Sequence, residues 1–483
     1  MKNLKNIFIN TRDNFVRLAE IHFTDKIAEI KFAETDEIHW EQINSIDKLT
    51  DYIKPLFPGD ALISAEILDG NFMLAMPGAI DPHVHFNTPG FEFREDFEHA
   101  SLAAACGGVT TIIDMPCTSI PPVTNKENFN LKLEALHGKS FIDFALWGGI
   151  GGDDLNSQKN IETQIFDLAE NGVAGFKVYA ISGMPVFKDL SYEQIETVAK
   201  IVKQTGKPLA VHAEDKQIVQ LIQQQRIKNG ANSWRDYTDS RSVEAEAKSI
   251  KQLAEIAERT GCKIHIVHLS SKKGMEIVSA YRKLGVNISA ETCPHFLQFT
   301  QKDFEKPAIR NFLKTAPPVK NKEDKEFLWY ALSQNEIEFV TTDHAGCDPA
   351  VEKSSGNFWE VYGGIPSVEH RVPFLFSEGF VKQKLSLEQT INFLSTNAAK
   401  FFQIENKGKL QSGFDADIAL INLWESEIIT HEKMHSKGKY TPFEGIRFNA
   451  AVEKTYLRGE IIYSRDDNFC GKIGAGKFMS CSR

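Results

Sequence analysis

A short apolar run followed by an amphipathic stretch occurs eight times between residues 76 and 402. Such alternation of strand and helix patterns predicts a parallel (β/α)8 barrel, the TIM-barrel fold. A doubly wound open sheet is the alternative, but no GxGxxG follows any of the predicted strands. Several predicted helices end in a glycine suited to a helix C-cap, namely Gly108, Gly172, Gly206, Gly261 and Gly285. The predicted strands are GAIDPHVHF, TTIIDM, IDFALWGG, GFKVYA, PLAVHAE, KIHIVHLS, NISAETCPH and EFVTTDHAG.

The two ends of the chain have a different hydrophobic pattern. Short apolar runs alternate with polar turns up to about residue 74, and the same pattern returns in ADIALIN and AAVEKTYLRG. We therefore expect a composite small β domain, β-sandwich-like, from residues 1–75 and 403–466, around a catalytic barrel of residues 76–402. Residues 467–483 are expected to form an extended or mobile tail, to which the sequence assigns no role.

Composition limits the partners and the compartment. The 483 residues carry a net charge of −10, which argues against a nucleic-acid surface. No window approaches the roughly 18 uncharged apolar residues of a membrane helix, and the first residues lack the apolar core of a signal peptide. The seven cysteines are scattered and form no CxxC, as is typical of reduced thiols. We expect a cytoplasmic protein that binds neither nucleic acid nor membrane.

Polar side chains interrupt five of the predicted strands near their carboxyl ends, where active sites of this fold lie. In DPHVH, His83 and His85 stand two residues apart and so project from one face of the strand. A lone HxH is a weak signal, because paired strand histidines are more often core or surface residues. Metal-compatible side chains at the ends of five strands are hard to explain as packing and predict a binuclear metal site. The candidate ligands are His83, His85, Lys177, His212, His268 and Asp343.

Lys177 is the unusual member of this set, because a protonated ammonium would repel a metal ion. Burial lowers the pKa of a lysine, and the neutral amine can react with carbon dioxide to give a carbamate. That anion could bridge two divalent ions, as in two-metal hydrolytic sites. A salt bridge to a carboxylate and a Schiff base are the other possibilities for Lys177, but neither accounts for the histidines.

The motifs DPHVHF, GFKVYA, VHAED, IVHLSS, ETCPH and TTDHAG, in this order, resemble those of the cyclic amidohydrolases, which include dihydroorotase, allantoinase, hydantoinase and dihydropyrimidinase. The resemblance runs from about Met76 to about Tyr463. It implies that His83, His85 and Asp343 hold one metal and that His212 and His268 hold the other. It also implies that Lys177, as N6-carboxylysine, bridges two divalent ions, for which zinc is suited, and that the chain forms a homodimer or homotetramer.

The expected reaction is the opening of a cyclic amide. A hydroxide shared by the two metals attacks the carbonyl, and Asp343, the catalytic residue, moves the proton to the leaving nitrogen. No covalent intermediate is needed, so Cys293 is read as a buried strand cysteine rather than a nucleophile.

Substrate choice must come from other positions. Where the resemblance to dihydroorotase implies an arginine for the substrate carboxylate, this chain has Asn87. Cys117 replaces an asparagine and Cys347 a histidine of that family, and the loss of a bidentate arginine is costly for an anionic ligand. The candidate substrate contacts are Asn87, Cys117, Cys293, Pro317 and Cys347.

Longer stretches, such as DMPCTSIPPVTN and GNFWEVYGGI, look like allantoinase. We therefore favour allantoin, a ureide, as substrate, then dihydroorotate, then hydantoin or dihydropyrimidines. A hypothesis from another class is a non-catalytic assembly protein of the same fold. That hypothesis predicts gaps in the ligand set, and the sequence contains none.

Overall fold

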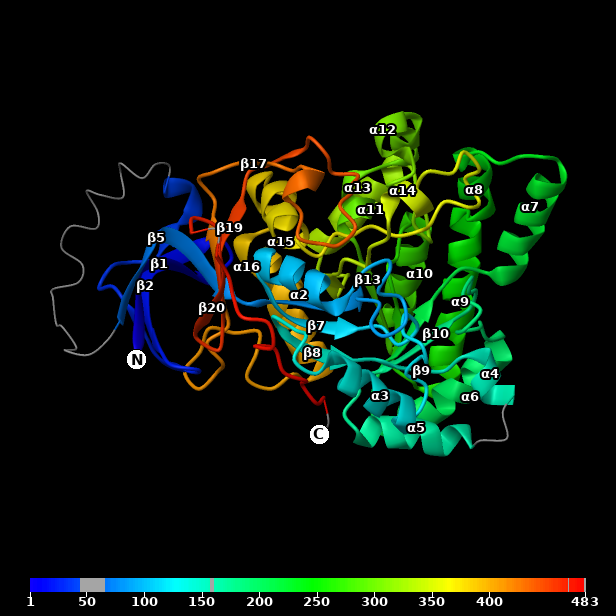
Figure 1. Cartoon of the computed structure of the whole chain (residues 1–483), viewed down its shortest axis with the longest axis horizontal. Helices are drawn as coiled ribbons and strands as arrows, with labels where there is room; N and C mark the ends of the chain where they lie inside the picture. The colour runs from blue at the N-terminus through cyan, green and yellow to red at the C-terminus, as the bar shows by residue number, and fades with distance from the viewer. Residues whose placement is uncertain (44–65, 157–159, 468, 482–483) are drawn as a thin grey trace.

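A computed structural model of the chain describes residues 1–43, 66–156, 160–467 and 469–481 (Figure 1). Residues 44–65 of the expected β domain and residues 468, 482 and 483 of the expected tail lie outside these ranges. Within them, no helix combines the length and the apolar character needed to cross a membrane.

All eight predicted barrel strands are present, and the third and the eighth are each divided in two. Every neighbouring pair is parallel, and the two hydrogen-bonded ladders, β15-β6-β7-β8 and β14-β13-β12-β11-β10-β9, share the divided strands. The (β/α)8 prediction is therefore confirmed. The strands are β6 (Ala79–His85), β7 (Val109–Asp114), β8 (Asp143–Leu146) with β9 (Gly148–Gly149), β10 (Phe176–Tyr179), β11 (Leu209–His212), β12 (Ile264–Ile266), β13 (Ile288–Thr292), and β14 (Phe339–Val340) with β15 (His344–Ala345).

Helices surround the barrel where the amphipathic stretches predicted them (Figure 1). All five glycines expected to end helices have positive φ, between 67° and 88°, the conformation that a C-cap glycine adopts. The predicted helices are α2 (Phe97–Cys106), α3 (Lys126–Leu136), α5 (Ile161–Glu170), α6 (Tyr192–Val202), α9 (Val243–Thr260), α10 (Lys272–Lys283), α13 (Lys322–Ser333), and α16 (Leu387–Ile391) continued by η5 (Asn392–Thr396) and α17 (Asn397–Phe402).

Two further helices, α7 (Lys216–Lys228) and α8 (Trp234–Ser240), follow the fifth strand and were not among those predicted. Val219 is the single fully buried residue of α7, so this helix lacks the wide apolar stripe that predicts a core-facing helix. Shorter helical segments follow later strands: α11 (Pro294–Gln298), α12 (Pro307–Arg310), α14 (Pro349–Glu352), and α15 (Arg371–Phe374) continued by η4 (Leu375–Val381).

The two chain ends share one mixed sheet, at the opposite end of the molecule from α7 and α8 (Figure 1). At its centre, β5 pairs in parallel with β1 and antiparallel with β16, so strands from both ends interleave. Leu4, Ile21, Ile418 and Tyr456 belong to one buried cluster of this sheet. The strand order is β21 (Phe469–Cys470), β20 (Glu460–Ser464), β19 (Ala451–Leu457), β16 (Ile418–Asn422), β5 (Glu66–Pro77), β1 (Lys2–Arg12), β2 (Phe15–Phe23) and β3 (Ile27–Phe32), and β4 (Ile38–His39) pairs with β2.

The described part of the C-terminal segment is extended and packs against the barrel. Phe478 forms a parallel bridge with Phe144 of β8, and the Met479 N–H donates to the Phe144 carbonyl. The Cys481 N–H donates to the carbonyl of Gly172. Residues 478–481 are thus held against β8 and against the turn between α5 and β10.

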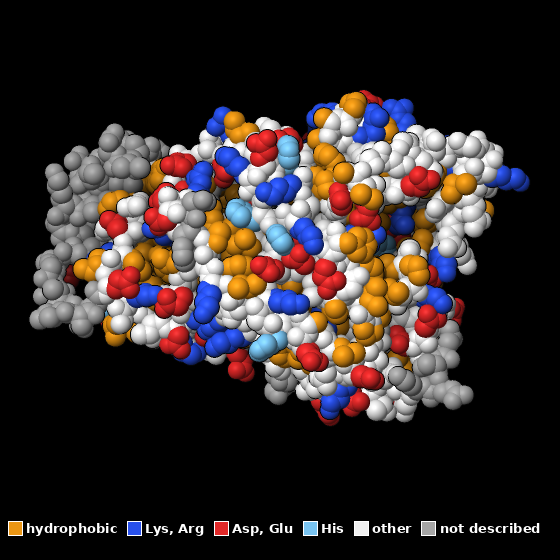
Figure 2. All heavy atoms as spheres, viewed as in Figure 1, with side chains coloured by type: hydrophobic (Ala, Val, Ile, Leu, Met, Phe, Trp, Pro, Cys, Tyr) orange, Lys and Arg blue, Asp and Glu red, His pale blue; other side chains and the backbone are white. Residues whose placement is uncertain are grey.

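Charges are mixed on the surface. On the face shown in Figure 2, acidic and basic side chains are interspersed. The net charge of −10 is therefore not gathered into a single patch on that face.

Candidate active site

His83 and His85 project to the same side of β6, as the two-residue period of a strand requires. Their ring centroids lie 5.4 Å apart, and Nε2 of each lies 3.2 Å and 3.1 Å, respectively, from Oδ1 of Asp343. Asp343 follows β14, the neighbour that closes the barrel. The side chain of His83 is 1% exposed and that of Asp343 17%, so the carboxylate is the more accessible end of this trio.

The other three predicted residues lie beside this trio. His212 ends β11 and His268 follows β12, and Nδ1 of the first lies 3.0 Å from Nε2 of the second. The rings of His83 and His268 are 5.5 Å apart. Lys177 of β10 is fully buried, with Nζ 5.0 Å from the ring of Tyr179, which itself stacks on His212. The structure therefore brings all six residues together at the carboxyl ends of the strands.

Two buried nitrogens of this cluster lack partners. Nζ of Lys177 and Nδ1 of His268 have no hydrogen-bond partner among the described residues. Buried polar atoms are nearly always satisfied, so unsatisfied ones at one site indicate a ligand or ion. Four imidazoles and a carboxylate are a donor set suited to a divalent transition-metal ion. The residues present fit a metal centre.

The electrostatics of the cluster suit a base and a reactive amine. Burial would raise the pKa of Asp343, but the adjacent His83 and His85 hold that pKa well below its usual range. Burial lowers the pKa of Lys177 to about 8, against the opposing effect of nearby acidic groups. At neutral pH, Asp343 is therefore ionised, and more of Lys177 is neutral than in an exposed lysine.

Two buried carboxylates behind the histidines were missed by sequence reasoning. Glu291 of β13 accepts hydrogen bonds from Nδ1 of His83 and, at 3.1 Å, from Nε2 of His265. Glu214 accepts one from Nε2 of His212 at 2.9 Å and is paired with Arg241. Each bond fixes the tautomer of its histidine, so that the lone pair lies on the nitrogen facing the cluster. The available signal was an acidic residue within a buried strand, as Glu291 is, or two residues after one, as Glu214 is.

His295 is a further residue that the sequence did not single out. It lies in α11, directly after β13, and neither ring nitrogen has a hydrogen-bond partner among the described residues. Burial lowers the pKa of His295 to about 4. Its position in ETCPH, after a strand that ends at the site, was the signal that could have identified it.

The five predicted substrate contacts are all buried, and they differ in surroundings. Cys117 contacts the cluster, with Sγ 3.8 Å from Nδ1 of His85 and 3.2 Å from the Tyr179 hydroxyl. Asn87 has positive φ (61°) and an unpartnered amide nitrogen within the described structure. Sγ of Cys293 lies 3.7 Å from the Thr341 hydroxyl, and Sγ of Cys347 lies 3.4 Å from that of Tyr440. The carbonyl of Pro317 accepts from the Thr315 hydroxyl at 2.8 Å.

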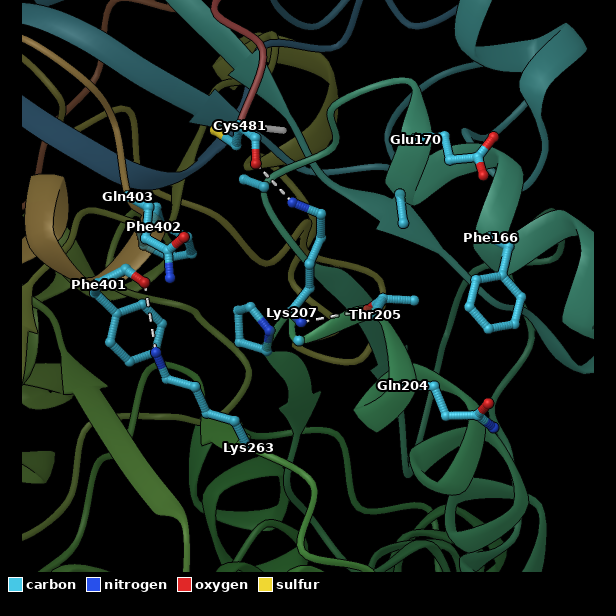
Figure 3. Close-up of a pocket in the computed structure, with 14 residues that line it drawn as sticks. Phe166, Glu170, Gln204, Thr205, Lys207, Lys263, Phe401, Phe402, Gln403 and Cys481 are labelled. Atoms are coloured by element: carbon cyan, nitrogen blue, oxygen red, sulfur yellow. Dashed lines mark hydrogen bonds between the residues drawn. The ribbon is translucent and has the colours of Figure 1, made fainter. Parts of the chain in front are cut away.

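A separate cavity of about 410 Å³ lies at the other end of the barrel (Figure 3). Two lysines that line it mark this end: Lys207 lies two residues before β11, and Lys263 directly precedes β12. The Lys207 ammonium donates to the Cys481 carbonyl at 2.7 Å. None of the six clustered residues lines this cavity, and in this fold the amino-terminal end of the barrel serves stability.

Known enzymes resemble this chain in sequence and in fold. The model of the amidohydrolase family matches residues 74–462. An allantoinase of Rubrobacter xylanophilus is 36% identical over 423 residues, which cover 86% of this chain and 90% of that protein. An allantoinase of Bacillus licheniformis is 34% identical over 424 residues, covering 85% and 90%. Among solved structures, an L-hydantoinase (dihydropyrimidinase) from Arthrobacter aurescens is 27% identical, with a TM-score of 0.87 and 99% of both chains covered.

Proposed function

Because the chain belongs to the amidohydrolase family and is a hydrolase of C–N bonds in cyclic amides, we propose that its substrate is allantoin, which it opens to allantoate. The observation that carries the proposal is the similarity to allantoinases, at 31–36% identity over about 86% of the chain. Asn87 supports it, because an amide in place of an arginine offers no bidentate cation to a free carboxylate of dihydroorotate.

The six clustered residues would hold two divalent ions, for which zinc is the natural choice. His83, His85 and Asp343 would bind one ion, His212 and His268 the other, and a carbamate on Lys177 would bind both. Bound there, the ions would lower the pKa of a water to near neutral and polarise the amide carbonyl. The lowered pKa of Lys177, about 8, favours the neutral amine that reacts with carbon dioxide.

The protein groups then have separate tasks. Glu291 and Glu214 hold His83 and His212 in the tautomers that face the cluster. The Asp343 carboxylate, ionised at neutral pH, accepts the proton of the attacking water and returns it to the ring nitrogen as the C–N bond breaks. Cys117, which lies beside His85, and Tyr179, which stacks on His212, would contact the ring, and Asn87 is a further candidate contact.

Hydantoin is the second candidate substrate, because the hydantoinase structures match the fold with TM-scores of 0.85–0.87. Allantoin is itself a hydantoin that carries a ureido group, so the two candidates share the scissile ring amide. They differ in the groups that must be recognised outside that ring.

A substrate panel tests the proposal. The metal-loaded enzyme is assayed with allantoin, hydantoin, dihydrouracil and dihydroorotate, and the Lys177→Ala variant serves as the control for contaminating activity. We expect the highest kcat/KM with allantoin. Turnover of dihydroorotate alone would overturn the choice of substrate, and turnover of none would favour the non-catalytic assembly role.

A further inference from the structure

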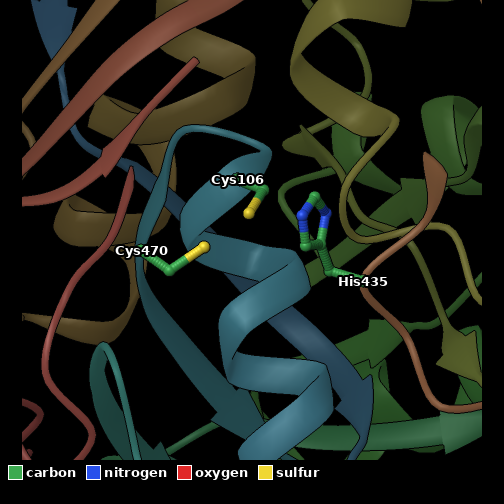
Figure 4. Close-up of side chains that lie close together, drawn as sticks. All are labelled: Cys106, His435 and Cys470. Atoms are coloured by element: carbon green, nitrogen blue, oxygen red, sulfur yellow. The ribbon is translucent and has the colours of Figure 1, made fainter. Parts of the chain in front are cut away.

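A second group of metal-compatible side chains lies outside the six-residue cluster. Cys106 ends α2, His435 lies in the segment between η6 (His431–Lys433) and β18 (Arg447–Phe448), and Cys470 ends β21. One ligand atom of each lies within 4.8 Å of the others. Figure 4 shows the two sulfurs facing one another and the imidazole turned towards them. Residues separated by more than 300 positions are thus brought to one point.

His435 is oriented for ligation. Its Nδ1 lies 2.8 Å from Oε1 of Glu369, and its backbone N–H donates to Oε2 of the same carboxylate at 2.9 Å. Both contacts engage Glu369, which leaves Nε2 of the ring turned towards the sulfurs (Figure 4). A histidine whose second nitrogen donates to a carboxylate is the usual arrangement around a bound metal.

The surroundings leave room for one more ligand. Cys106 is 5% exposed and Cys470 is half-buried. A cavity of about 340 Å³ is lined in part by Cys106, Glu369, His435 and Tyr463, and it is large enough for water. Two thiolates, one imidazole and one water match a four-coordinate zinc site.

We propose that Cys106, His435 and Cys470 form a further zinc-binding site, separate from the active site. Zinc suits this donor set because thiolate and imidazole are soft to borderline ligands, whereas Mg²⁺ and Ca²⁺ prefer oxygen. Tetrahedral zinc places such donors about 3.5–3.8 Å apart, so small side-chain rotations from the observed arrangement suffice. Binding replaces the two thiol protons, which leave to solvent, and no electron is transferred.

The location suggests what the ion does. Cys106 lies at the end of α2 that leads into β7, so the site is at the opposite end of the barrel from the six clustered residues. The ion would join α2 of the barrel to two C-terminal segments, the one that carries His435 and the one that ends in β21. It would stabilise the packing of these segments on the barrel and take no part in ring opening.

A disulfide between Cys106 and Cys470 is the competing use of the two sulfurs. It would not require an imidazole held by a carboxylate and turned towards them, as His435 is. The pair is therefore better explained as metal ligands.

Cobalt substitution and metal analysis of the whole protein test the site. Wild-type protein loaded with Co²⁺ should show sulfur-to-cobalt charge-transfer absorption, because the six residues of the active site include no sulfur. The Cys470→Ala and His435→Asn variants should lose or shift this absorption and bind one equivalent less of Zn²⁺ per chain. Cys262→Ala, which removes a buried cysteine outside the cluster, is the matched control. All variants should keep cyclic-amide hydrolysis, which also verifies folding.

Equal zinc content in wild-type and Cys470→Ala protein, or an unchanged cobalt spectrum, would overturn the site. So would a count of five free thiols, out of seven cysteines, that rises to seven on reduction, because the sulfurs would then form a disulfide. Neither outcome bears on the proposed substrate, which is tested by hydrolysis alone.

Discussion

Asp343 is the residue on which the proposed proton transfer depends. Replacing it with asparagine removes the group that accepts the proton, and general acid–base catalysis contributes about 10²–10⁴-fold. We expect Asp343→Asn to lower kcat by that factor. Asp348→Asn is the matched control, because Asp348 is an exposed helix cap for which asparagine is an equal substitute. An Asp343→Asn variant with wild-type kcat would contradict the proposed mechanism.

Glu291 would act indirectly, by orienting the metal ligand His83. Its carboxylate holds Nδ1 of His83, and loss of such a partner typically costs about 10–100-fold in metal affinity or activity. Glu291→Gln should weaken zinc binding by that amount, measured by competition with a chelator. Glu246→Gln removes another buried carboxylate, one that accepts from Ser270, and should leave zinc affinity unchanged. Equal affinities in the two variants would show that Glu291 does not position His83.

At the scale of residues, the sequence predicted which side chains lie together at the site. It did not predict which carboxylates hydrogen-bond the histidines. His83, His85 and the other four candidates follow from strand ends that the fold brings together. Glu291 and Glu214 could not be chosen from one sequence, because which buried carboxylate reaches which imidazole depends on the twist and register of the strands. The six residues lie together as expected, and their role as metal ligands remains a prediction.

At the scale of elements, α10 illustrates a helix whose end is dictated by one residue. Gly285 has φ of +84°, and a Cβ added there would meet no atom within 4 Å. A substitution therefore isolates the cost of a left-handed backbone for an L-residue, about 1–2 kcal/mol. Gly285→Ala should lower the free energy of unfolding by about that amount in chemical denaturation.

Gly356 provides the matched control for this prediction. It also has no atom within 4 Å of an added Cβ, but its φ is not in the left-handed region. Gly356→Ala should change the free energy of unfolding by less than about 0.5 kcal/mol. A similar loss in both variants would mean that backbone strain is not the cause.

Elements with strong periodicity were the ones predicted correctly. Strand candidates such as GFKVYA and helices such as α9 carry both an apolar pattern and a clear end signal. α7 was missed because its single buried residue, Val219, leaves almost no pattern to detect. Tertiary packing, which a pattern cannot show, decides such cases.

At the scale of the whole molecule, a buried ion cluster joins the barrel to the mixed sheet. Nζ of Lys407 lies 2.8 Å from Asp143 of β8 and 2.5 Å from Asp417, which directly precedes β16. Arg458, beside β19, also pairs with Asp143 and donates to the Ala475 carbonyl of the C-terminal segment. The barrel, the sheet and the C-terminal segment therefore meet at one set of charges.

Removing the central cation should be costly. Lys407→Met leaves Asp143 and Asp417 buried with less compensation, and breaking such a cluster typically costs about 3–5 kcal/mol. Burial opposes the charge of Lys407, but Asp417 and Asp143 hold its pKa above the usual value. The stabilising charge of Lys407 is therefore present at neutral pH, and its contribution is lost as the pH rises through that elevated pKa. Lys409→Met, at an exposed position, is the control; equal unfolding midpoints would contradict the role of the cluster.

The overall organisation followed from the sequence more fully than its details. The alternation of short apolar runs and polar turns at both ends predicted a shared β domain. The mixed sheet contains strands from both of those segments. The packing of Phe478 and Met479 on β8 had no sequence signal, because a short extended segment has no periodicity of its own.

The central claim is that metal ions held by the six-residue cluster open a cyclic amide. The most direct measurement is the rate of allantoate formation from allantoin by chelator-stripped enzyme, followed as Zn²⁺ is added back in the presence of bicarbonate. We predict that the stripped enzyme is inactive, that zinc restores the rate, and that Lys177→Ala protein is not restored. Undiminished hydrolysis by the stripped enzyme would contradict the claim.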